Sequence, residues 1–310
     1  MIVNINNLVK RYDDVLAVDH LNLQIQEGEI FGLLGPNGSG KSTTINCILA
    51  LLEYDKGSIE VFNEEMSPES YDIKRNIGVI FQQVAVFEEL TVYENIKYFC
   101  SLYVKDKNEV KRLTEEAISF VSLEDYVKFF PSKLSGGLLR RLNIACGIAH
   151  KPKLIILDEP TVAVDPQSRN KILEGIKKLN EDGATVIYTT HYMEEAEQIC
   201  DRIAIIDKGK VIALGTKEEL KAMISIGEKI TIEVFSLEQN QLKDIKELPR
   251  VLSVEYKGNF LSVKLTKGKN NLFQILSYLM DHEIPFQQVF TEQPTLNDVF
   301  LEITGKTLRD

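Results

Sequence analysis

The residues best suited to chemistry in this chain are Gly35-Pro-Asn-Gly-Ser-Gly-Lys-Ser-Thr43, which fit the pattern G-x-x-x-x-G-K-[ST] of a phosphate-binding loop. Gly38 and Gly40 let the backbone turn so that successive N–H groups can point inward at an anion. Lys41 adds a positive charge for the β- and γ-phosphates, and the Ser42 hydroxyl can bind Mg²⁺. The loop therefore predicts binding of a nucleoside triphosphate. The predicted binding residues are Asn37, Gly38, Gly40, Lys41, Ser42 and Thr43.

The segments on either side place this loop between a strand and a helix. Residues 29–34 are predicted to form a buried parallel strand. Residues 42–52 are predicted to form a helix, whose N-terminal dipole favours phosphate. This context argues against a chance match of a short pattern.

Two carboxylates, Asp158 and Glu159, end a predicted strand that starts at residue 153 and is apolar over residues 154–157. Carboxylates at the end of a central parallel strand are costly to desolvate unless a cation or a substrate uses them. We expect Asp158 to hold Mg²⁺ through water, and Glu159 to orient or deprotonate the water that attacks a γ-phosphate. The alternative is an acid pair that caps the following helix.

Two more polar residues follow predicted strands. Gln82 follows the strand 77–81, where its amide could reach a metal or an attacking water; a solvated loop glutamine is the alternative. His191 closes the strand 184–190, which favours a phosphate-sensing role. The histidines without such a placement, expected to be structural or on the surface, are His20, His150 and His282.

A second candidate phosphate site, Ser135-Gly136-Gly137, opens another helix. An N-cap hydroxyl and two exposed backbone N–H groups would form an anion site without a lysine. Because the phosphate loop already serves its own nucleotide, the economical arrangement is a head-to-tail pair of chains with two-fold symmetry. Each Ser135 helix would then cover the γ-phosphate held by Lys41 of the other chain. ATP would join the pair and hydrolysis would release it.

The composition is that of an ordinary globular protein. With 310 residues the chain is long enough for two domains, and no apolar run approaches the roughly 18 residues of a membrane-spanning helix. The N-terminus lacks the basic start and apolar core of a signal peptide. A net charge of -10 argues against nucleic acid or anionic lipid as the main partner. The widely spaced cysteines, expected to be reduced core residues of a cytosolic protein, are Cys47, Cys100, Cys146 and Cys200.

The order of the predicted elements divides the chain into two domains. Residues 1–222 form the first, in which short antiparallel strands precede an α/β core and a helical subdomain over about residues 88–150. Residues 226–310 form an accessory domain whose βαββαβ order indicates a small ferredoxin-like α+β fold. A last helix begins with a Thr295–Asp298 capping box and ends at Gly305. Packing or dimer support is the plainer interpretation of this domain, and ligand sensing is the alternative.

Over roughly residues 1–220, the order of these motifs resembles the nucleotide-binding subunit of ABC transporters. The matching segments are the phosphate loop, Gln82, Leu134-Ser-Gly-Gly137, Leu157-Asp-Glu-Pro160, Val164-Asp-Pro166 and Thr189-Thr-His191. The resemblance implies a P-loop NTPase (RecA-like) core with an antiparallel β subdomain and a helical subdomain. It also implies that Tyr12, otherwise readable as a surface aromatic at a turn, is the platform for adenine. Gln82 would be the metal and coupling glutamine, and Asp165 would lie in the dimer-facing loop.

Two residues depart from the pattern of that family. Leu138 follows the signature segment (Leu134 to Gly137), where the family usually has Gln or another polar residue or Met, which puts the nearby contacts to nucleotide or partner in doubt. Ala163 stands where many members have Gly, so its methyl group could restrain φ and tune coupling in the dimer.

These features together predict an ATPase subunit that dimerises on ATP with a second copy or a related cassette, and drives export through a separate ABC-2-type membrane permease. Export is favoured because residues 295–310 look like the C-terminus of bacterial multidrug and antibiotic export ATPases of the daunorubicin-resistance type. The subunit would be cytoplasmic and peripheral on the inner face of the cell membrane. Residues 82–94, with Phe87 and Leu90, and the helical insertion would receive the cytoplasmic helices of the permease. A soluble ABC ATPase acting as a non-transport switch is the alternative.

Overall fold

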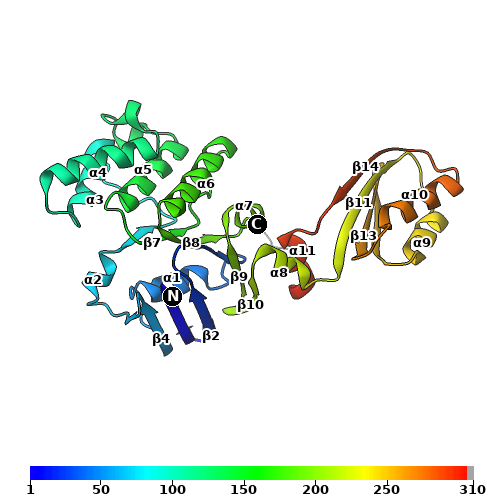
Figure 1. Cartoon of the computed structure of the whole chain (residues 1–310), viewed down its shortest axis with the longest axis horizontal. Coiled ribbons are helices and arrows are strands. Elements are labelled where there is room, and N and C mark those ends of the chain that lie inside the picture. The colour runs from blue at the N-terminus through cyan, green and yellow to red at the C-terminus, as the bar shows by residue number, and fades with distance from the viewer. Residues whose placement is uncertain (306–310) are drawn as a thin grey trace. The chain divides into compact units, whose positions relative to one another are not determined.

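The computed structural model describes residues 1–305, which form two compact units (Figure 1). The first unit comprises Met1–Thr216, and the second begins at Lys217. Each has a hydrophobic core of its own. Among the described helices, none is long and apolar enough to cross a lipid bilayer.

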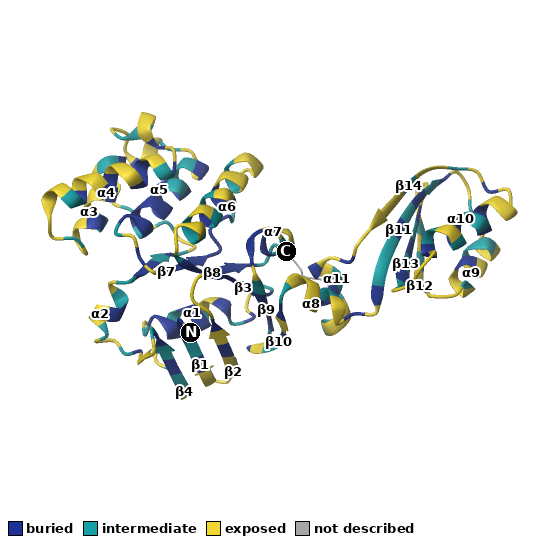
Figure 2. Ribbon diagram, viewed as in Figure 1, coloured by how far each residue is buried: buried dark blue, intermediate teal, exposed yellow. Residues whose placement is uncertain are grey.

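A six-stranded sheet in the order β10-β9-β3-β8-β7-β6 is the centre of the first unit. Its parallel strands are β3 (Ile30–Leu34), β6 (Ile77–Ile80), β7 (Leu154–Asp158), β8 (Thr185–Thr190) and β9 (Arg202–Asp207), and the antiparallel edge strand is β10 (Lys210–Gly215). Every residue of β3, β7 and β8 is buried, as Figure 2 shows, because a parallel sheet is covered on both faces. Since these strands are parallel neighbours, the segments that follow them leave the sheet at the same edge.

A four-stranded antiparallel sheet in the order β2-β1-β4-β5 packs around α1 (Lys41–Ile48), which also contacts β7. Its strands are β1 (Val3–Tyr12), β2 (Val15–Ile25), β4 (Lys56–Val61) and β5 (Glu64–Glu65). The prediction that α1 continues to residue 52 was wrong. Ala50 adopts a left-handed conformation (φ 48°), and the N–H groups of Leu51 and Leu52 both donate to the carbonyl of Asn46, which closes the helix.

Three helices build the predicted helical subdomain: α3 (Val92–Ser101), α4 (Lys107–Phe120) and α5 (Gly136–Ile148). A capping box between Thr91 and Glu94 starts α3. The other helices of the unit are α2 (Tyr71–Lys74), α6 (Pro166–Glu181) and α7 (Met193–Ile199). Helix α5 contacts α3 and α4 on one side and β6 and α6 on the other, so it joins the subdomain to the sheet.

The second unit has the predicted βαββαβ order, with its sheet arranged as β12-β13-β11-β14 and all neighbours antiparallel. The elements are α8 (Lys217–Ala222), β11 (Ile226–Val234), α9 (Gln239–Glu247), β12 (Val251–Lys257), β13 (Phe260–Thr266), α10 (Asn271–Asp281), β14 (Phe286–Glu292) and α11 (Leu296–Thr304). The expected Thr295–Asp298 capping box starts α11, and Gly305 (φ 67°) ends it. Residues 306–310, the end of the segment that resembles export ATPases, lie outside the described residues.

Candidate functional site

The phosphate loop connects β3 to α1, as predicted. Gly38 (φ 77°) and Gly40 (φ 109°) both lie in the left-handed region, and a Cβ on Gly40 would come within 2.5 Å of the Ala17 carbonyl oxygen, so a side chain does not fit there. Gly40 is the N-cap of α1, whose first N–H groups are suited to an anion. The exposed residues of the loop region are Asn37, Gly38 and Ser42, and Thr43 is half-buried.

Lys41 is the buried cation of this loop, with 4% of its surface exposed. Its Nζ donates to the carbonyl oxygens of Gly35 (2.8 Å) and Pro36 (3.2 Å) and lies 3.2 Å from Glu159 Oε1. Because both charged groups are buried, their attraction is much less screened by water and salt than that of a surface pair.

Glu159 is the point at which the residues predicted from separate strands meet. Besides Lys41 on Oε1, its Oε2 accepts a hydrogen bond from Gln82 Nε2 (3.4 Å) and lies 3.3 Å from His191 Nδ1. Glu159 is 6% exposed and has φ 48°, a conformation that is uncommon for a residue with a side chain. The fold therefore brings the ends of β3, β6, β7 and β8 to one carboxylate.

Asp158, the neighbouring carboxylate, is held by Thr189 at the end of β8. The Thr189 Oγ1 donates to Asp158 Oδ1 (2.6 Å) and accepts from the N–H of Glu159 (2.9 Å). One buried hydroxyl thus fixes the position of both acids. Sequence reasoning assigned Thr189 no role, although its place two residues before His191, on the strand beside β7, is a signal that could have found it.

A second buried carboxylate, Glu195 on α7, ties together the backbone behind this cluster. Its Oε2 accepts hydrogen bonds from Thr161 Oγ1 (2.9 Å), Tyr188 OH (2.8 Å) and Thr190 Oγ1 (2.9 Å). Burial and the nearby charge of Glu195 hold the pKa of Tyr188 well above its usual range. The network links the turn after Glu159 to the residue before His191, and sequence reasoning did not find it.

Ser135 is the N-cap of α5, and its Oγ accepts from the N–H of Leu138 (3.3 Å). Ser135 and Gly136 are exposed, whereas Gly137 is buried, and a Cβ on Gly137 would lie 2.4 Å from Ser168 Oγ in α6. The N-cap of α6 is Asp165, which accepts from the N–H of Ser168 (2.9 Å). The signature segment and the predicted dimer-facing loop therefore touch within one chain.

Within the described part of the chain, neither Tyr12 nor Ser135 forms a hydrogen bond or an ion pair with the Glu159 cluster. Tyr12 is the last residue of β1 and is 45% exposed, with Lys10 Nζ 5.2 Å from the centre of its ring. Ala163, the second departure from the family pattern, has φ 59°. Its backbone therefore adopts the left-handed conformation, which glycine adopts with less strain than alanine.

Residues 18–162 match the family model described as ABC transporter, and residues 215–304 match the model described as ATP-binding protein DrrA1-3-like, C-terminal domain. Over 306 residues, 98% of each chain, the sequence is 39% identical to the linearmycin resistance ATP-binding protein LnrL of Bacillus subtilis (strain 168). The chain belongs to the ABC transporter ATP-binding proteins. This ABC protein is also 34% identical over 309 residues to the daunorubicin resistance ATP-binding protein DrrA3 of Streptomyces coeruleorubidus, covering 99% of this chain and 97% of the relative.

Solved structures of ABC cassettes match the first unit. One is the dimeric structure of a cassette in a post-hydrolysis state bound to ADP and Pi, with a TM-score of 0.64 and 31% identity over 69% of this chain and 98% of that one. Another is an ATP-binding subunit of an ABC transporter, with a TM-score of 0.66 and 27% identity over 72% of this chain and 93% of that one. The predicted fold class and ATPase activity are confirmed: this ABC protein has a P-loop NTPase core, binds ATP and is an ATPase.

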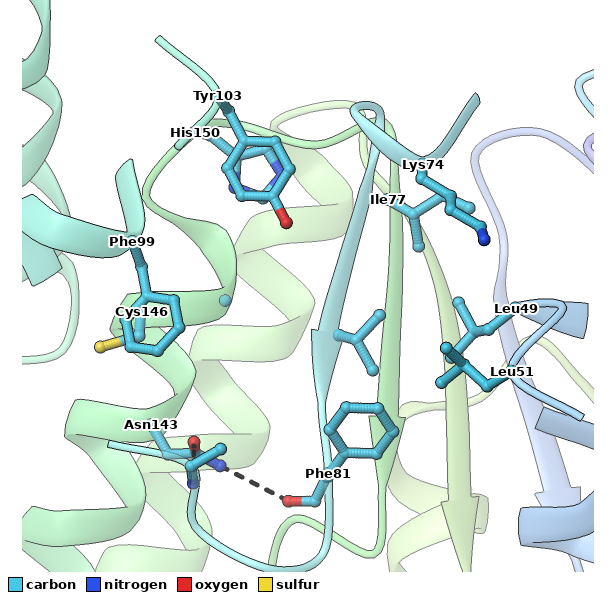
Figure 3. Close-up of a pocket in the computed structure, with 13 residues that line it drawn as sticks. Leu49, Leu51, Lys74, Ile77, Phe81, Phe99, Tyr103, Asn143, Cys146 and His150 are labelled. Atoms are coloured by element: carbon cyan, nitrogen blue, oxygen red, sulfur yellow. Dashed lines mark hydrogen bonds between the residues drawn. The ribbon is translucent and has the colours of Figure 1, made fainter. Parts of the chain in front are cut away.

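A cavity of about 310 Å³ lies where β6 faces α3 and α5 (Figure 3). Its lining includes Leu49, Ile77, Phe81, Phe99, Cys146 and His150. The His150 ring stacks on Tyr103, with 3.9 Å between ring centres. Burial lowers the pKa of His150 to about 4, although the backbone of Ile77 acts in the opposite direction.

This burial predicts an acid sensitivity of the fold. In the unfolded chain His150 binds a proton with an ordinary pKa of about 6.5, whereas in the folded chain its pKa is about 4. Below about pH 6.5 the unfolded chain therefore binds more protons than the folded chain. The contribution of neutral His150 to the free energy of unfolding is thus fully present above about pH 6.5 and is lost as the pH falls toward 4. Between pH 7 and pH 5 we expect this residue to lower the free energy of unfolding by about 2 kcal/mol. Urea unfolding of the wild type and of His150→Gln at both pH values measures it. Equal losses in the two proteins would contradict it.

Proposed function

We propose that this chain is the ATP-hydrolysing subunit of a bacterial exporter, which dimerises on ATP and drives transport through a separate ABC-2-type membrane permease. The observation that carries the hydrolytic part is the meeting of Lys41, Gln82 and His191 on the buried carboxylate of Glu159. Export is supported by relatives that are named for linearmycin and daunorubicin resistance and that are similar over nearly the whole chain. The subunit would then lie at the inner face of the cell membrane.

Each residue of the cluster has a part in the proposed reaction. Lys41 and the N–H groups of the loop hold the phosphates, and the exposed ring of Tyr12 supports adenine. Glu159 accepts a proton from the attacking water. Gln82 and His191, which both lie against the Glu159 carboxylate, orient that water and respond to the γ-phosphate.

The residues present also fit Mg²⁺. The exposed hydroxyl of Ser42, the amide of Gln82 and the carboxylate of Asp158 supply oxygen donors, which are the ligands that this ion prefers. Ser42 and Gln82 would hold it directly and Asp158 through water, with Thr189 fixing the carboxylate. Bound there, the ion would neutralise charge on the phosphates.

The second copy, or a related cassette, would complete each site with its signature segment. The exposed N-terminus of α5 at Ser135 and Gly136 is suited to a γ-phosphate held by another chain, and Gly137 supports it from the α6 side. The similar cassette of known structure is a dimer. A head-to-tail dimer with two ATP sites is therefore the assembly that we propose.

The permease would dock beside the cavity, where apolar side chains remain exposed. Phe87 is 42% exposed, and its ring lies 5.0 Å from that of Tyr98 and 5.8 Å from that of Phe99. The fully buried Asn95 holds the loop in place, since its Oδ1 accepts from the N–H of Phe87 (2.8 Å) and its Nδ2 donates to the Phe87 carbonyl (2.9 Å). Such a rigid apolar rim suits a short cytoplasmic helix.

Co-expression and co-purification with a candidate ABC-2-type permease from the same genome test the proposal. We expect Phe87→Glu to lower the recovery of the complex by about ten-fold or more, because a charge placed in an apolar contact costs more than about 1.4 kcal/mol. Phe129→Glu is the matched control, since Phe129 is equally exposed (42%) on the same subdomain. Its ring lies 5.5 Å from that of Tyr126, whereas the Phe87 ring lies against Phe99, which lines the cavity. Unchanged recovery of the complex with Phe87→Glu would rule out docking of the permease at Phe87. A wild-type chain that binds no membrane protein would favour the soluble switch.

A further inference from the structure

Arg140, on α5, is a buried charged residue that the site described so far does not use. It is 6% exposed, and its guanidinium donates to two successive backbone carbonyls, from Nη1 to Phe81 (3.0 Å) and from Nη2 to Gln82 (2.8 Å). One turn further along α5, Asn143 Nδ2 donates to the same Phe81 carbonyl (3.4 Å), as Figure 3 shows, and its Oδ1 accepts from the N–H of Ala85 (3.1 Å). Hydrogen bonds from α5 thus hold the backbone at Phe81, Gln82 and Ala85.

The surroundings of Arg140 indicate that it serves to hold the backbone in a fixed position. No acidic side chain of the described residues forms an ion pair with it, and burial lowers its pKa. A buried cation without a counter-ion costs more than an apolar side chain of the same size, so packing alone does not explain an arginine here. The planar guanidinium donates to the two carbonyls from two different nitrogens whose relative positions are fixed, whereas a lysine would offer a single nitrogen on a flexible stem.

In the proposed dimer, helix α5 contacts two different ATP sites. Ser135 at the N-terminus of α5 faces the nucleotide of the other copy in the proposed dimer. Through Arg140, the same helix holds Gln82, whose side chain donates to Glu159 of its own chain (3.4 Å). A rigid helix therefore connects the nucleotide of one copy to the catalytic carboxylate of the other.

We propose that Arg140 is a positioning residue that couples the two ATP sites of the dimer. The partner's nucleotide fixes the position of the N-terminus of α5. Because Arg140 is hydrogen-bonded to the backbone of Gln82, this in turn fixes that backbone and places the Gln82 amide at the carboxylate of Glu159. Each site then hydrolyses ATP at its full rate only when the other is filled. This inference rests on the proposed dimer.

Steady-state hydrolysis by the full chain as a function of ATP concentration tests the coupling. We expect Arg140→Met to lower kcat by roughly ten-fold to a hundred-fold, since small displacements of catalytic groups have effects of that size, while KM changes much less. The Hill coefficient should fall from about two toward about one. Arg141→Met is the matched control, because the neighbouring arginine on the same helix donates to the carbonyls of Val121 (2.7 Å) and Ser122 (3.1 Å) instead, and it should leave both parameters near wild type.

The outcomes separate this inference from the proposed function. If the wild type hydrolyses ATP without cooperativity and Glu159→Gln does not dimerise on ATP, the dimer fails and the coupling fails with it. If the wild type is cooperative, a wild-type kcat and Hill coefficient in Arg140→Met, or an equal loss in Arg141→Met, overturns the role of Arg140. Should Arg140→Met not fold, Arg140→Lys decides. Lysine keeps the charge but lacks the planar pair of nitrogens that fixes the two carbonyls relative to each other, so we expect a partial loss of both kcat and the Hill coefficient. Unchanged parameters in Arg140→Lys overturn the proposal.

Discussion

The Glu159→Gln protein should bind ATP, remain dimeric in its presence and hydrolyse it about 10²-fold to 10⁴-fold more slowly than the wild type. Glutamine has the size of glutamate and can keep the contacts to Gln82 and His191, but its amide cannot accept a proton from water. Removing the negative charge also releases Lys41 from its 3.2 Å ion pair, so its charge stays available to phosphate. The change therefore removes chemistry and leaves binding intact.

Light scattering with ATP and Mg²⁺, together with phosphate release, measures both parts of this expectation. Glu29→Gln is a matched control: Glu29 is also a buried carboxylate (8% exposed), paired with Arg202 (3.1 Å), but it precedes β3 at the end remote from the phosphate loop. We expect this control to hydrolyse ATP near the wild-type rate and to dissociate afterwards. Wild-type turnover by Glu159→Gln would remove Glu159 as the base.

The Lys41→Ala protein should lose most of its affinity for ATP. A hydrogen bond to a charged group contributes about 1.5–3 kcal/mol, which corresponds to a Kd raised by roughly ten-fold to more than a hundred-fold. Alanine also leaves the carboxylate of Glu159 buried without its cation, which adds repulsion toward the phosphates. Titration with a fluorescent ATP analogue measures the loss.

Lys210→Ala serves as the control, because Lys210 is an exposed lysine of the same unit (62% exposed) that pairs with Asp19 on the surface. Thermal unfolding of both variants separates loss of binding from loss of fold. A Kd for Lys41→Ala within two-fold of the control would show that the backbone of the loop alone holds the phosphates, contrary to our expectation.

Local signals made much of this fold predictable from the sequence. The apolar stretches that became β3 and β7 are short, which favours buried strands over helices. The capping box at Thr295 marks a helix start that the structure places at the same residue. The end of α1 was missed because it depends on the left-handed conformation of Ala50, which an alanine rarely adopts and which the sequence therefore does not indicate.

The cluster itself was predictable in outline, because parallel strands deliver their carboxyl ends to one edge of the sheet. The residues behind it were not. Helix α7 carries several glutamates, and only packing decides that Glu195 is the one that turns inward to three hydroxyl groups. Arg140 and Arg141 are adjacent and chemically identical, so the sequence does not say which of them reaches the backbone at Gln82.

The turn that follows β7 is preorganised by the folding of the chain. Glu159 (φ 48°) and Ala163 (φ 59°) both hold left-handed conformations, which cost roughly 1–2 kcal/mol each for residues that carry a Cβ. The bonds of Thr189 and Glu195 keep this turn from relaxing. In the mechanism that we propose, the carboxylate would therefore hold its working position before any nucleotide arrives, and the energy for placing it would come from folding, not from ATP binding.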